Sequence, residues 1–219
     1  MDRYSFAREA IVRAGKLLYD RLLVASNDGN ISARVGNNEI LITPTGVSKG
    51  FMACEDIVLI DMDGNVLSGG KPSSEYNMHI AVYKNRSDVL ACVHAHPPKA
   101  TAFASSSQSL DSLLLPEAVL ALGNVACTEY ASPSTHELAK SVASCIGEAD
   151  VLLLSCHGAL TVGKDVMDAY FKMESLEHVA SIALYTRLWG NRMPLPDGER
   201  ERLLDIRRDI YGKQVIKKP

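Results

Sequence analysis

The sequence predicts a single α/β domain covering residues 1–219. Segments with apolar residues at helical spacing alternate along the chain with short β-branched runs bounded by turn formers. Apolar residues make up 47% of the chain, which is enough to bury a substantial core. No linker, internal repeat or low-complexity segment divides the sequence. One layered domain of helices and strands is therefore expected.

The first half of the chain is predicted to start with a helix and to continue with strands. Residues 5–22 carry apolar side chains at helical spacing. Short apolar runs separated by turn formers follow, and the predicted strands are 31–34, 40–42, 57–60 and 66–67. Ser73 or Ser74 is expected to cap a helix over residues 75–85, and the apolar run 89–93 is expected to form the next strand.

The second half is predicted to contain one more buried strand and three helices. Ser134 and Glu137 have the spacing of a capping box, which predicts a helix from there to about residue 146. The apolar run 151–156 reads as a buried strand. Residues 165–189 carry a broad apolar face typical of a long helix, and a charged helix over 199–211 follows a break at Leu195-Pro196.

Charge and composition argue against two classes of partner. The net charge is −3 and no long basic block occurs, so the footprint of a nucleic-acid binder is missing. No apolar run approaches the roughly 20 residues that cross a membrane, and no secretory signal is recognisable. The five cysteines are scattered and odd in number, which predicts reduced and mostly buried thiols. A cytoplasmic protein is expected.

Three histidines follow predicted strands. His94 and His96 come at the end of the run 89–93, and a spacing of two in a strand points both imidazoles to one face. His157 follows the run 151–156 and precedes Gly158. Taken alone, a His-x-His pair is more typical of ordinary surface or core histidines than of a metal site. Three imidazoles at strand ends, however, would form a metal site with open coordination positions, as catalytic sites require.

Three turn clusters could bind an oxyanion through backbone amides and hydroxyl groups. They are the segments 27–30, 43–46 and 71–74. Ser73 and Ser74 are the best placed, because they precede a predicted helix whose first N–H groups attract anions. Each cluster alone also fits an ordinary turn or cap. No Walker or dinucleotide-binding fingerprint occurs.

Two further residues are candidates for proton transfer. Glu75 begins the helix after the two serines and could remove a proton next to a carbonyl group. His79 lies one turn later on the same face, where simple packing is the favoured interpretation. Tyr130, in a turn-rich segment, could donate a proton on the other side of a substrate.

The motifs together resemble those of a known family. Gly29-Asn30-Ile31-Ser32, Thr43-Pro44-Thr45-Gly46, Ser73-Ser74-Glu75, His94-Ala95-His96 and His157-Gly158 are similar, in order and spacing, to the motif series of the class II aldolase/adducin family. The series spans most of the chain. Within the family, the L-fuculose-phosphate aldolases and related sugar-phosphate aldolases are most similar to this sequence. The resemblance implies a three-layer α/β/α fold with a mostly antiparallel central sheet. It also implies a homotetramer of fourfold symmetry with active sites between subunits.

The resemblance assigns roles residue by residue. His94, His96 and His157 would hold Zn²⁺, although Mn²⁺, Co²⁺ and Ni²⁺ also accept imidazole ligands. Glu75 would be a ligand or near-ligand and the catalytic acid/base, and Tyr130 would protonate the aldehyde oxygen. Tyr211 would reach an active site and influence the choice of aldehyde. The residues implied around the substrate phosphate are Gly29, Asn30, Thr45, Gly46, Ser73 and Ser74.

The implied reaction is the reversible cleavage of a ketose 1-phosphate, such as L-fuculose 1-phosphate, into dihydroxyacetone phosphate and an aldehyde. Related dehydratases of methylthioribulose 1-phosphate and decarboxylases of sugar-acid phosphates use a similar histidine triad, so they stay open as alternatives. A non-catalytic, adducin-like interaction module is disfavoured because the three histidines and Glu75 are all present.

Two residues depart from the better-known aldolases. Asp28 replaces a small or hydroxyl residue, and its carboxylate would be unfavourable if it faced a phosphate. Lys49 is either a phosphate partner or an ordinary surface lysine, and the second interpretation is favoured.

Overall fold

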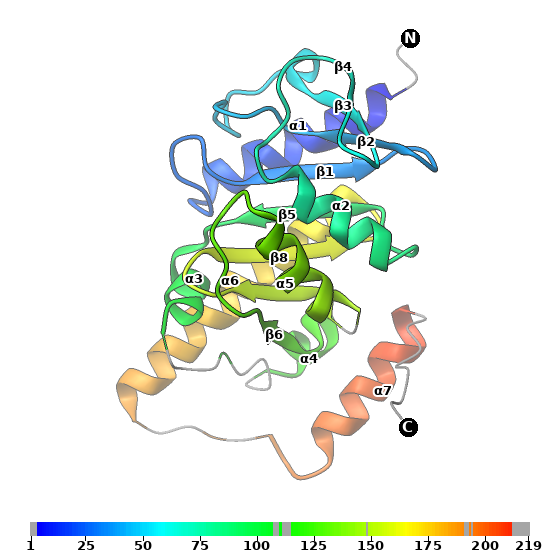
Figure 1. Cartoon of the computed structure of the whole chain (residues 1–219). Helices are drawn as coiled ribbons and strands as arrows, with labels where there is room; N and C mark the ends of the chain where they lie inside the picture. The colour runs from blue at the N-terminus through cyan, green and yellow to red at the C-terminus, as the bar shows by residue number, and fades with distance from the viewer. Residues whose placement is uncertain are drawn as a thin grey trace.

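The structure, a computed structural model, describes residues 4–106, 110, 115–147, 149–190, 193 and 195–211. The described strands form one eight-stranded sheet (Figure 1). Its order across the sheet is β4 (Val66–Ser68), β3 (Val58–Asp61), β2 (Glu39–Ile42), β1 (Asn30–Arg34), β5 (Ala91–Ala95), β8 (Gly158–Gly163), β7 (Val151–Leu154) and β6 (Val125–Cys127). Within the described residues β6 and β7 are the one parallel pair, so the mostly antiparallel sheet is confirmed.

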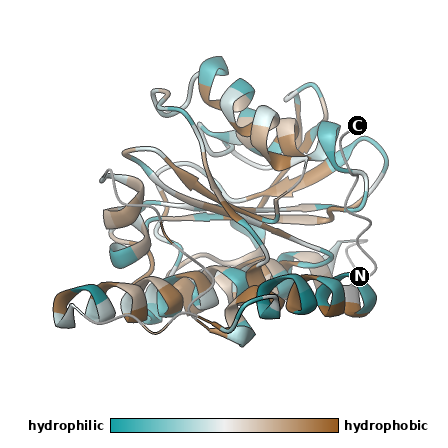
Figure 2. Cartoon of the chain, turned by 90° about the horizontal axis from the view of Figure 1, so that it is seen from below, coloured by the Kyte–Doolittle hydropathy of each residue, from teal (hydrophilic) through white to brown (hydrophobic). Residues whose placement is uncertain are grey.

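Helices cover both faces of this sheet (Figure 2). One face packs against α1 (Ser5–Asp20), α3 (Pro98–Ala104), α4 (Pro116–Leu122) and α6 (Val166–Trp189). The other face packs against α2 (Tyr76–Asn85) and α5 (His136–Ile146). The last helix, α7 (Glu199–Tyr211), lies beside α4, and a short 3-10 turn, η1 (Cys54–Asp56), precedes β3. The three-layer α/β/α architecture is confirmed.

The core consists of two apolar layers, one on each side of the sheet. Ile31 and Val93 face α1 and α6, whereas Ile40, Ile42 and Ile60 face α2 and α5. Because side chains alternate along a strand, a sheet covered on both faces needs apolar residues at consecutive positions. This explains why the strands appear in the sequence as continuous apolar runs.

Most predicted elements are confirmed to within a few residues, but the helix caps differ. Thr135, not Ser134, caps α5, because its side chain accepts a hydrogen bond from the Leu138 amide while Ser134 has a left-handed backbone with φ of 65°. The N-cap of α2 is Glu75 rather than Ser73 or Ser74, and its side chain makes no cap bond, while the Ser73 hydroxyl accepts from the Glu75 amide at 3.3 Å. The expected start of α6 at Asp165 is confirmed, since Asp165 accepts from the Asp168 amide.

Antiparallel pairing brings the ends of several strands together along one edge of the sheet, which here means the edge formed by strand ends and not an outer strand. Asn30, at the start of β1, pairs with His94 near the end of β5. Ala95, at the end of β5, pairs with Ala159 near the start of β8, and the turn before β8 contains His157. The end of β2 lies at this edge too, because Ile42 pairs with Ser32. The loops with the candidate residues therefore converge at this edge.

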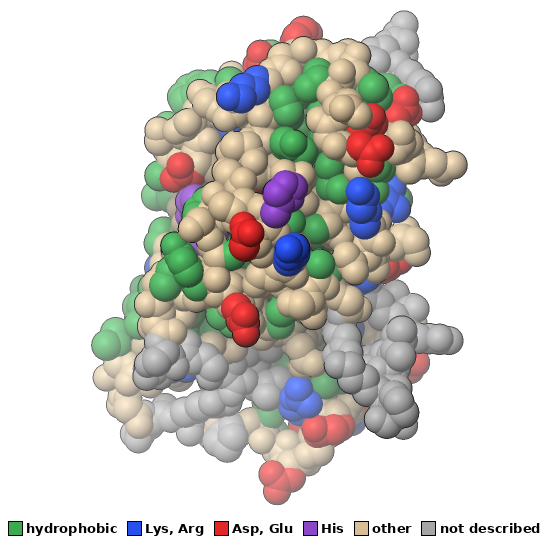
Figure 3. Space-filling model, viewed as in Figure 1, with side chains coloured by type: hydrophobic (Ala, Val, Ile, Leu, Met, Phe, Trp, Pro, Cys, Tyr) green, Lys and Arg blue, Asp and Glu red, His purple; other side chains and the backbone are tan. Residues whose placement is uncertain are grey.

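The outer surface carries charges of both signs. Acidic and basic side chains are interspersed on the face shown in Figure 3. In the described part of the chain, no helix combines the length and the hydropathy needed to cross a membrane. All five cysteines are free, as expected, but Cys92 alone among them is fully buried, so the expectation of mostly buried thiols is wrong.

Candidate active site

Three imidazole rings meet at the edge of the sheet described above. The ring centroid of His94 lies 4.9 Å from that of His96 and 4.7 Å from that of His157. Each ring offers a nitrogen ligand, and these three nitrogens all lie within 4.8 Å of one another. The structure thus brings together the three histidines predicted from the sequence.

Two local features hold the rings in place. The His94 Nδ1–H donates to the carbonyl oxygen of Ala159 at 2.9 Å, which leaves the Nε2 lone pair directed into the site. At Gly158 a Cβ atom would lie 2.5 Å from the His96 ring and 2.6 Å from the Ala95 carbonyl oxygen. A glycine is therefore required where β8 begins, because a side chain there would displace the imidazoles.

The geometry and the donor set fit a divalent cation. The Nε2 atoms of His94 and His96 are 3.1 Å apart, a separation that two bonds of about 2.0–2.1 Å to one ion can bridge. Burial lowers the pKa of His96, and it lowers the pKa of His157 to about 4. Both rings are therefore neutral near pH 7 and have lone pairs available for a metal.

Glu75 completes the cluster. Its Oε2 atom is 3.2 Å from His94 Nε2, and its Oε1 atom is 3.5 Å from His157 Nε2. Burial alone raises the pKa of the Glu75 carboxyl, but His94, and then His157 and the Asn30 amide, lower it well below its usual value. The buried Oε1 atom has no hydrogen-bond partner. An ionised carboxylate, one oxygen of which has no hydrogen-bond partner, thus faces the three imidazoles.

The carboxylate of Asp28 lies behind one of the rings. Its Oδ2 atom is 3.4 Å from His96 Nδ1, on the side of the ring away from His94. An outer carboxylate of this kind orients a histidine ligand and fixes which nitrogen carries the proton. Asp28 therefore faces His96, an interaction that the sequence did not predict.

The three loops predicted to bind phosphate lie next to one another. The Thr45 amide donates to the backbone carbonyl oxygen of Lys71 at 3.2 Å, and the Ser73 amide donates to that of Thr43 at 3.0 Å. Ser74 and Gly46 are exposed, whereas Ser73 is buried and accepts a hydrogen bond from the Glu75 amide. Gly29 has φ of +75°, and a Cβ atom there would lie 2.8 Å from the His94 carbonyl oxygen.

Asn30, which was also predicted to bind the phosphate, is buried, and its side-chain amide makes hydrogen bonds to two other side chains. Its Nδ2 atom donates to Glu75 Oε2 at 3.0 Å, and its Oδ1 atom is 2.5 Å from His79 Nε2. His79 is fully buried, in line with the packing interpretation, but it also makes hydrogen bonds through both ring nitrogens. Ser32 and Tyr83 belong to the same network and were missed, because polar residues within apolar segments gave no signal of their own.

Lys49 is not the surface residue that the sequence suggested. It is only 1% exposed, and its ammonium group donates to the carbonyl oxygens of Asn27 and Val47. Burial lowers the pKa of Lys49 to about 8, although the nearby Asp28 carboxylate acts in the opposite direction. Lys49 thus links the loop before β1 to the loop after β2.

The two predicted tyrosines lie farther from the histidines. Tyr130 is 64% exposed in the loop after β6, and that loop reaches the site region through a 2.9 Å hydrogen bond from Ser134 to Ser74. The side chain of Tyr211 lies outside the described part of the chain. One turn before it, Arg207 pairs with Asp150, which precedes β7 and thus lies at the opposite edge of the sheet.

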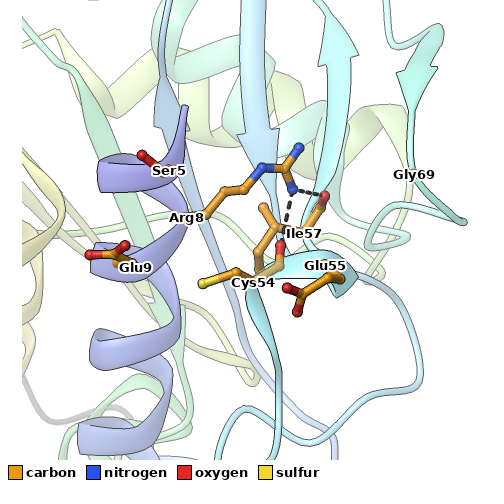
Figure 4. A pocket seen from close by; sticks show the side chains of 7 residues that line it. All are labelled: Ser5, Arg8, Glu9, Cys54, Glu55, Ile57 and Gly69. Carbon is orange, nitrogen blue, oxygen red and sulfur yellow. Dashed lines mark hydrogen bonds between the residues drawn. The ribbon is translucent and has the colours of Figure 1, made fainter. Parts of the chain in front are cut away.

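A separate cavity of about 510 Å³ lies between the start of α1 and η1 (Figure 4). Arg8 spans it and donates to the backbone carbonyls of Cys54 and Ile57. The side chains of Glu9 and Glu55 line its wall. None of the predicted site residues lines this cavity, and Arg8 serves there to fasten η1 to α1.

Known proteins resemble this chain in sequence and in fold. The sequence matches the family described as Class II Aldolase and Adducin N-terminal domain over residues 9–184. An L-fuculose phosphate aldolase of Methanococcus maripaludis is 43% identical over 171 residues, which are 78% of this chain and 92% of that protein. A 3-oxo-tetronate 4-phosphate decarboxylase of Haemophilus influenzae is 32% identical over 191 residues, 85% of this chain and 90% of that protein. A solved L-fuculose 1-phosphate aldolase superimposes with a TM-score of 0.83 at 29% identity, covering 92% of this chain and 96% of the other. The chain therefore belongs to the class II aldolase and adducin family.

Proposed function

We propose that the protein is a metal-dependent aldolase that reversibly cleaves a ketose 1-phosphate, similar to L-fuculose 1-phosphate, into dihydroxyacetone phosphate and an aldehyde. The observation that carries this proposal is the ionised Glu75 carboxylate, 3.2 Å and 3.5 Å from two of the three clustered imidazoles. The names of the relatives, which refer to phosphorylated sugars and sugar acids, support a substrate of this chemical class.

In this mechanism Glu75 moves the proton. His94, His96 and His157 would hold a divalent cation, which would supply Lewis-acid stabilisation of negative charge on the substrate. The open Oε1 atom of Glu75 accepts the proton from the carbon next to the carbonyl group and returns it in the reverse direction. The loops at Gly29, Thr45–Gly46 and Ser73–Ser74 hold the phosphate, which keeps the reacting carbon in register with Glu75.

Three finer features complete the proposal. The metal is Zn²⁺, with Mn²⁺, Co²⁺ or Ni²⁺ as possible substitutes at the same nitrogen ligands. The phenol of Tyr130 protonates the aldehyde oxygen. The protein works in the cytoplasm as a homotetramer, in which Tyr211 reaches the site of a neighbouring subunit. The position of α7 at the far edge of its own sheet is consistent with such a role between subunits.

A decarboxylase acting on a sugar-acid phosphate is the second candidate. The 32% identity to a 3-oxo-tetronate 4-phosphate decarboxylase favours it, because the loss of CO₂ also leaves negative charge next to a carbonyl group, which a cation at the same three histidines would stabilise. A methylthioribulose-1-phosphate dehydratase would need the same site. An adducin-like interaction module would need neither the neutral imidazoles nor the buried carboxylate.

Proton exchange separates these functions without knowledge of the aldehyde. Zinc-loaded protein is incubated with dihydroxyacetone phosphate in deuterated water, with and without a chelator, and NMR follows the loss of one carbon-bound proton. The aldolase proposal expects exchange that stops when the chelator is added. No exchange by protein with verified bound metal would contradict it, and decarboxylase and dehydratase substrates would then be tested.

A further inference from the structure

A chain of buried hydrogen bonds runs from the sheet and α2 to Glu75. Tyr83 Oη lies 2.7 Å from Ser32 Oγ, and Ser32 Oγ lies 2.7 Å from His79 Nδ1. His79 Nε2 lies 2.5 Å from Asn30 Oδ1, and Asn30 Nδ2 lies 3.0 Å from Glu75 Oε2. Every residue before Glu75 in this chain is at most 3% exposed, so water does not compete for these bonds.

The two ends of the Asn30 amide fix the direction of the bonds next to Glu75. The Asn30 Nδ2–H donates to Glu75 Oε2 at 3.0 Å, as only the nitrogen end of the amide can donate to a carboxyl oxygen. The Asn30 carbonyl oxygen then faces His79, whose Nε2 atom must therefore carry a proton. The reversed amide would place two acceptors, Oδ1 and the carboxylate, against each other at about 3 Å.

The same reasoning extends through His79. Burial lowers the pKa of His79 to about 3, so the ring is neutral and has one proton, on Nε2. Its Nδ1 atom must then accept from the Ser32 hydroxyl, and the Ser32 oxygen in turn accepts from Tyr83. All four bonds therefore point in one direction, toward the catalytic carboxylate.

We propose that His79 is a positioning residue that acts through Asn30: it locks the amide so that its N–H faces Glu75 and holds the carboxylate in place. Ser32 and Tyr83 select the required tautomer of His79. The functional part of this inference rests on the proposed function, because it assigns Glu75 the role of the base. A ring that merely filled space in the core would require no particular tautomer.

The tautomer is tested directly by NMR on the zinc-loaded chain with ¹⁵N-labelled histidine. The signals of His79 are identified by their disappearance in the variant His79→Gln. The inference expects a neutral ring with the proton on Nε2. A proton on Nδ1, or a charged imidazolium near pH 7, would overturn it. This measurement needs no substrate, so it judges the inference even if the proposed function fails.

Two substitutions test the positioning role. In the variant His79→Gln the amide nitrogen occupies the place of Nε2 and can still donate to Asn30, whereas in His79→Asn the amide reaches only the place of Nδ1 and Ser32. We expect His79→Asn to lower the rate of proton exchange about tenfold or more and His79→Gln to retain most of it. The expected loss in His79→Asn lies in kcat, with KM for dihydroxyacetone phosphate little changed.

A matched control separates positioning from loss of stability. Thr161 is fully buried and its hydroxyl donates to Ala169 on the opposite face of the sheet, so Thr161→Val also removes one buried hydrogen bond. We expect this variant to unfold at a lower temperature yet to keep its exchange rate. If exchange follows the melting temperature alone across the three variants, the positioning role is overturned. If the wild type has bound metal but no exchange, the proposed function is what fails.

Discussion

At the scale of single residues, the contact between Asp28 and His96 leads to a prediction about metal affinity. The variant Asp28→Asn removes the negative charge 3.4 Å from His96 Nδ1 and should weaken zinc binding by about tenfold. Competition with a chromophoric chelator measures the change. Asp63→Asn is the matched control, since it removes the same charge from an exposed turn far along the chain. Equal affinities of the two variants would contradict the role of Asp28.

The buried histidines predict how stability depends on pH. Burial lowers the pKa of His157 to about 4 and that of His79 to about 3. In the unfolded chain the pKa of a histidine is about 6.5. Between these values the unfolded chain binds protons that the folded chain does not. Stability of the metal-free protein should therefore fall as the pH falls from about 6.5 to about 4, with a limit of about 1.4 kcal/mol per pH unit for each histidine. Urea unfolding that is equally cooperative and stable at both ends of this range would contradict the prediction.

The sequence predicted single residues best where strand ends determine their positions. His94, His96 and His157 follow apolar runs, and the pairing of β5 with β8 brings those runs together. Lys49 and His79 were less predictable, because their burial and hydrogen bonds depend on loops and helices distant in the sequence.

At the scale of elements, one buried carboxylate joins three parts of the fold. Asp150, before β7, lies 3.1 Å from Arg86 at the end of α2, 3.5 Å from Lys172 on α6 and 2.9 Å from Arg207 on α7. The variant Asp150→Ala leaves these cations without that partner and should cost about 3–5 kcal/mol of unfolding free energy.

The neighbouring Asp88 provides the control for this prediction. It also binds Arg86, at 2.7 Å, but its side chain is 55% exposed. Asp88→Ala should therefore cost less than about 1 kcal/mol. Urea unfolding of both variants measures the difference, and equal losses would show that burial of Asp150 is not what matters.

The elements that the sequence did not predict are short or depend on tertiary contacts. The strand β6 has three residues, and β8 begins and ends with glycine, so neither shows a clear strand pattern. The helix α3 has seven residues, and its first amides, Lys99 and Ala100, donate to Glu177 on α6. The first amides of α3 are thus bonded by a distant residue, and its local signal is limited to Pro98 at the first helical position.

At the scale of the whole molecule, the proposed tetramer is a testable property. Large apolar side chains such as Phe51, Leu188 and Trp189 are 73% or more exposed in the single chain. Groups of exposed apolar residues typically mark association surfaces. Light scattering after size exclusion should give four times the chain mass of 23.8 kDa. A monomer at micromolar concentration would contradict the tetramer and the proposed role of Tyr211 in a neighbouring site.

The central claim is that Glu75 moves the proton and the three histidines hold the metal. The most direct test is proton exchange into dihydroxyacetone phosphate by the wild type and by Glu75→Gln, with the bound zinc measured in both. We expect Glu75→Gln to keep its zinc and to lose exchange by at least about a hundredfold, the typical contribution of a general base. Full exchange by Glu75→Gln with zinc bound would contradict the account.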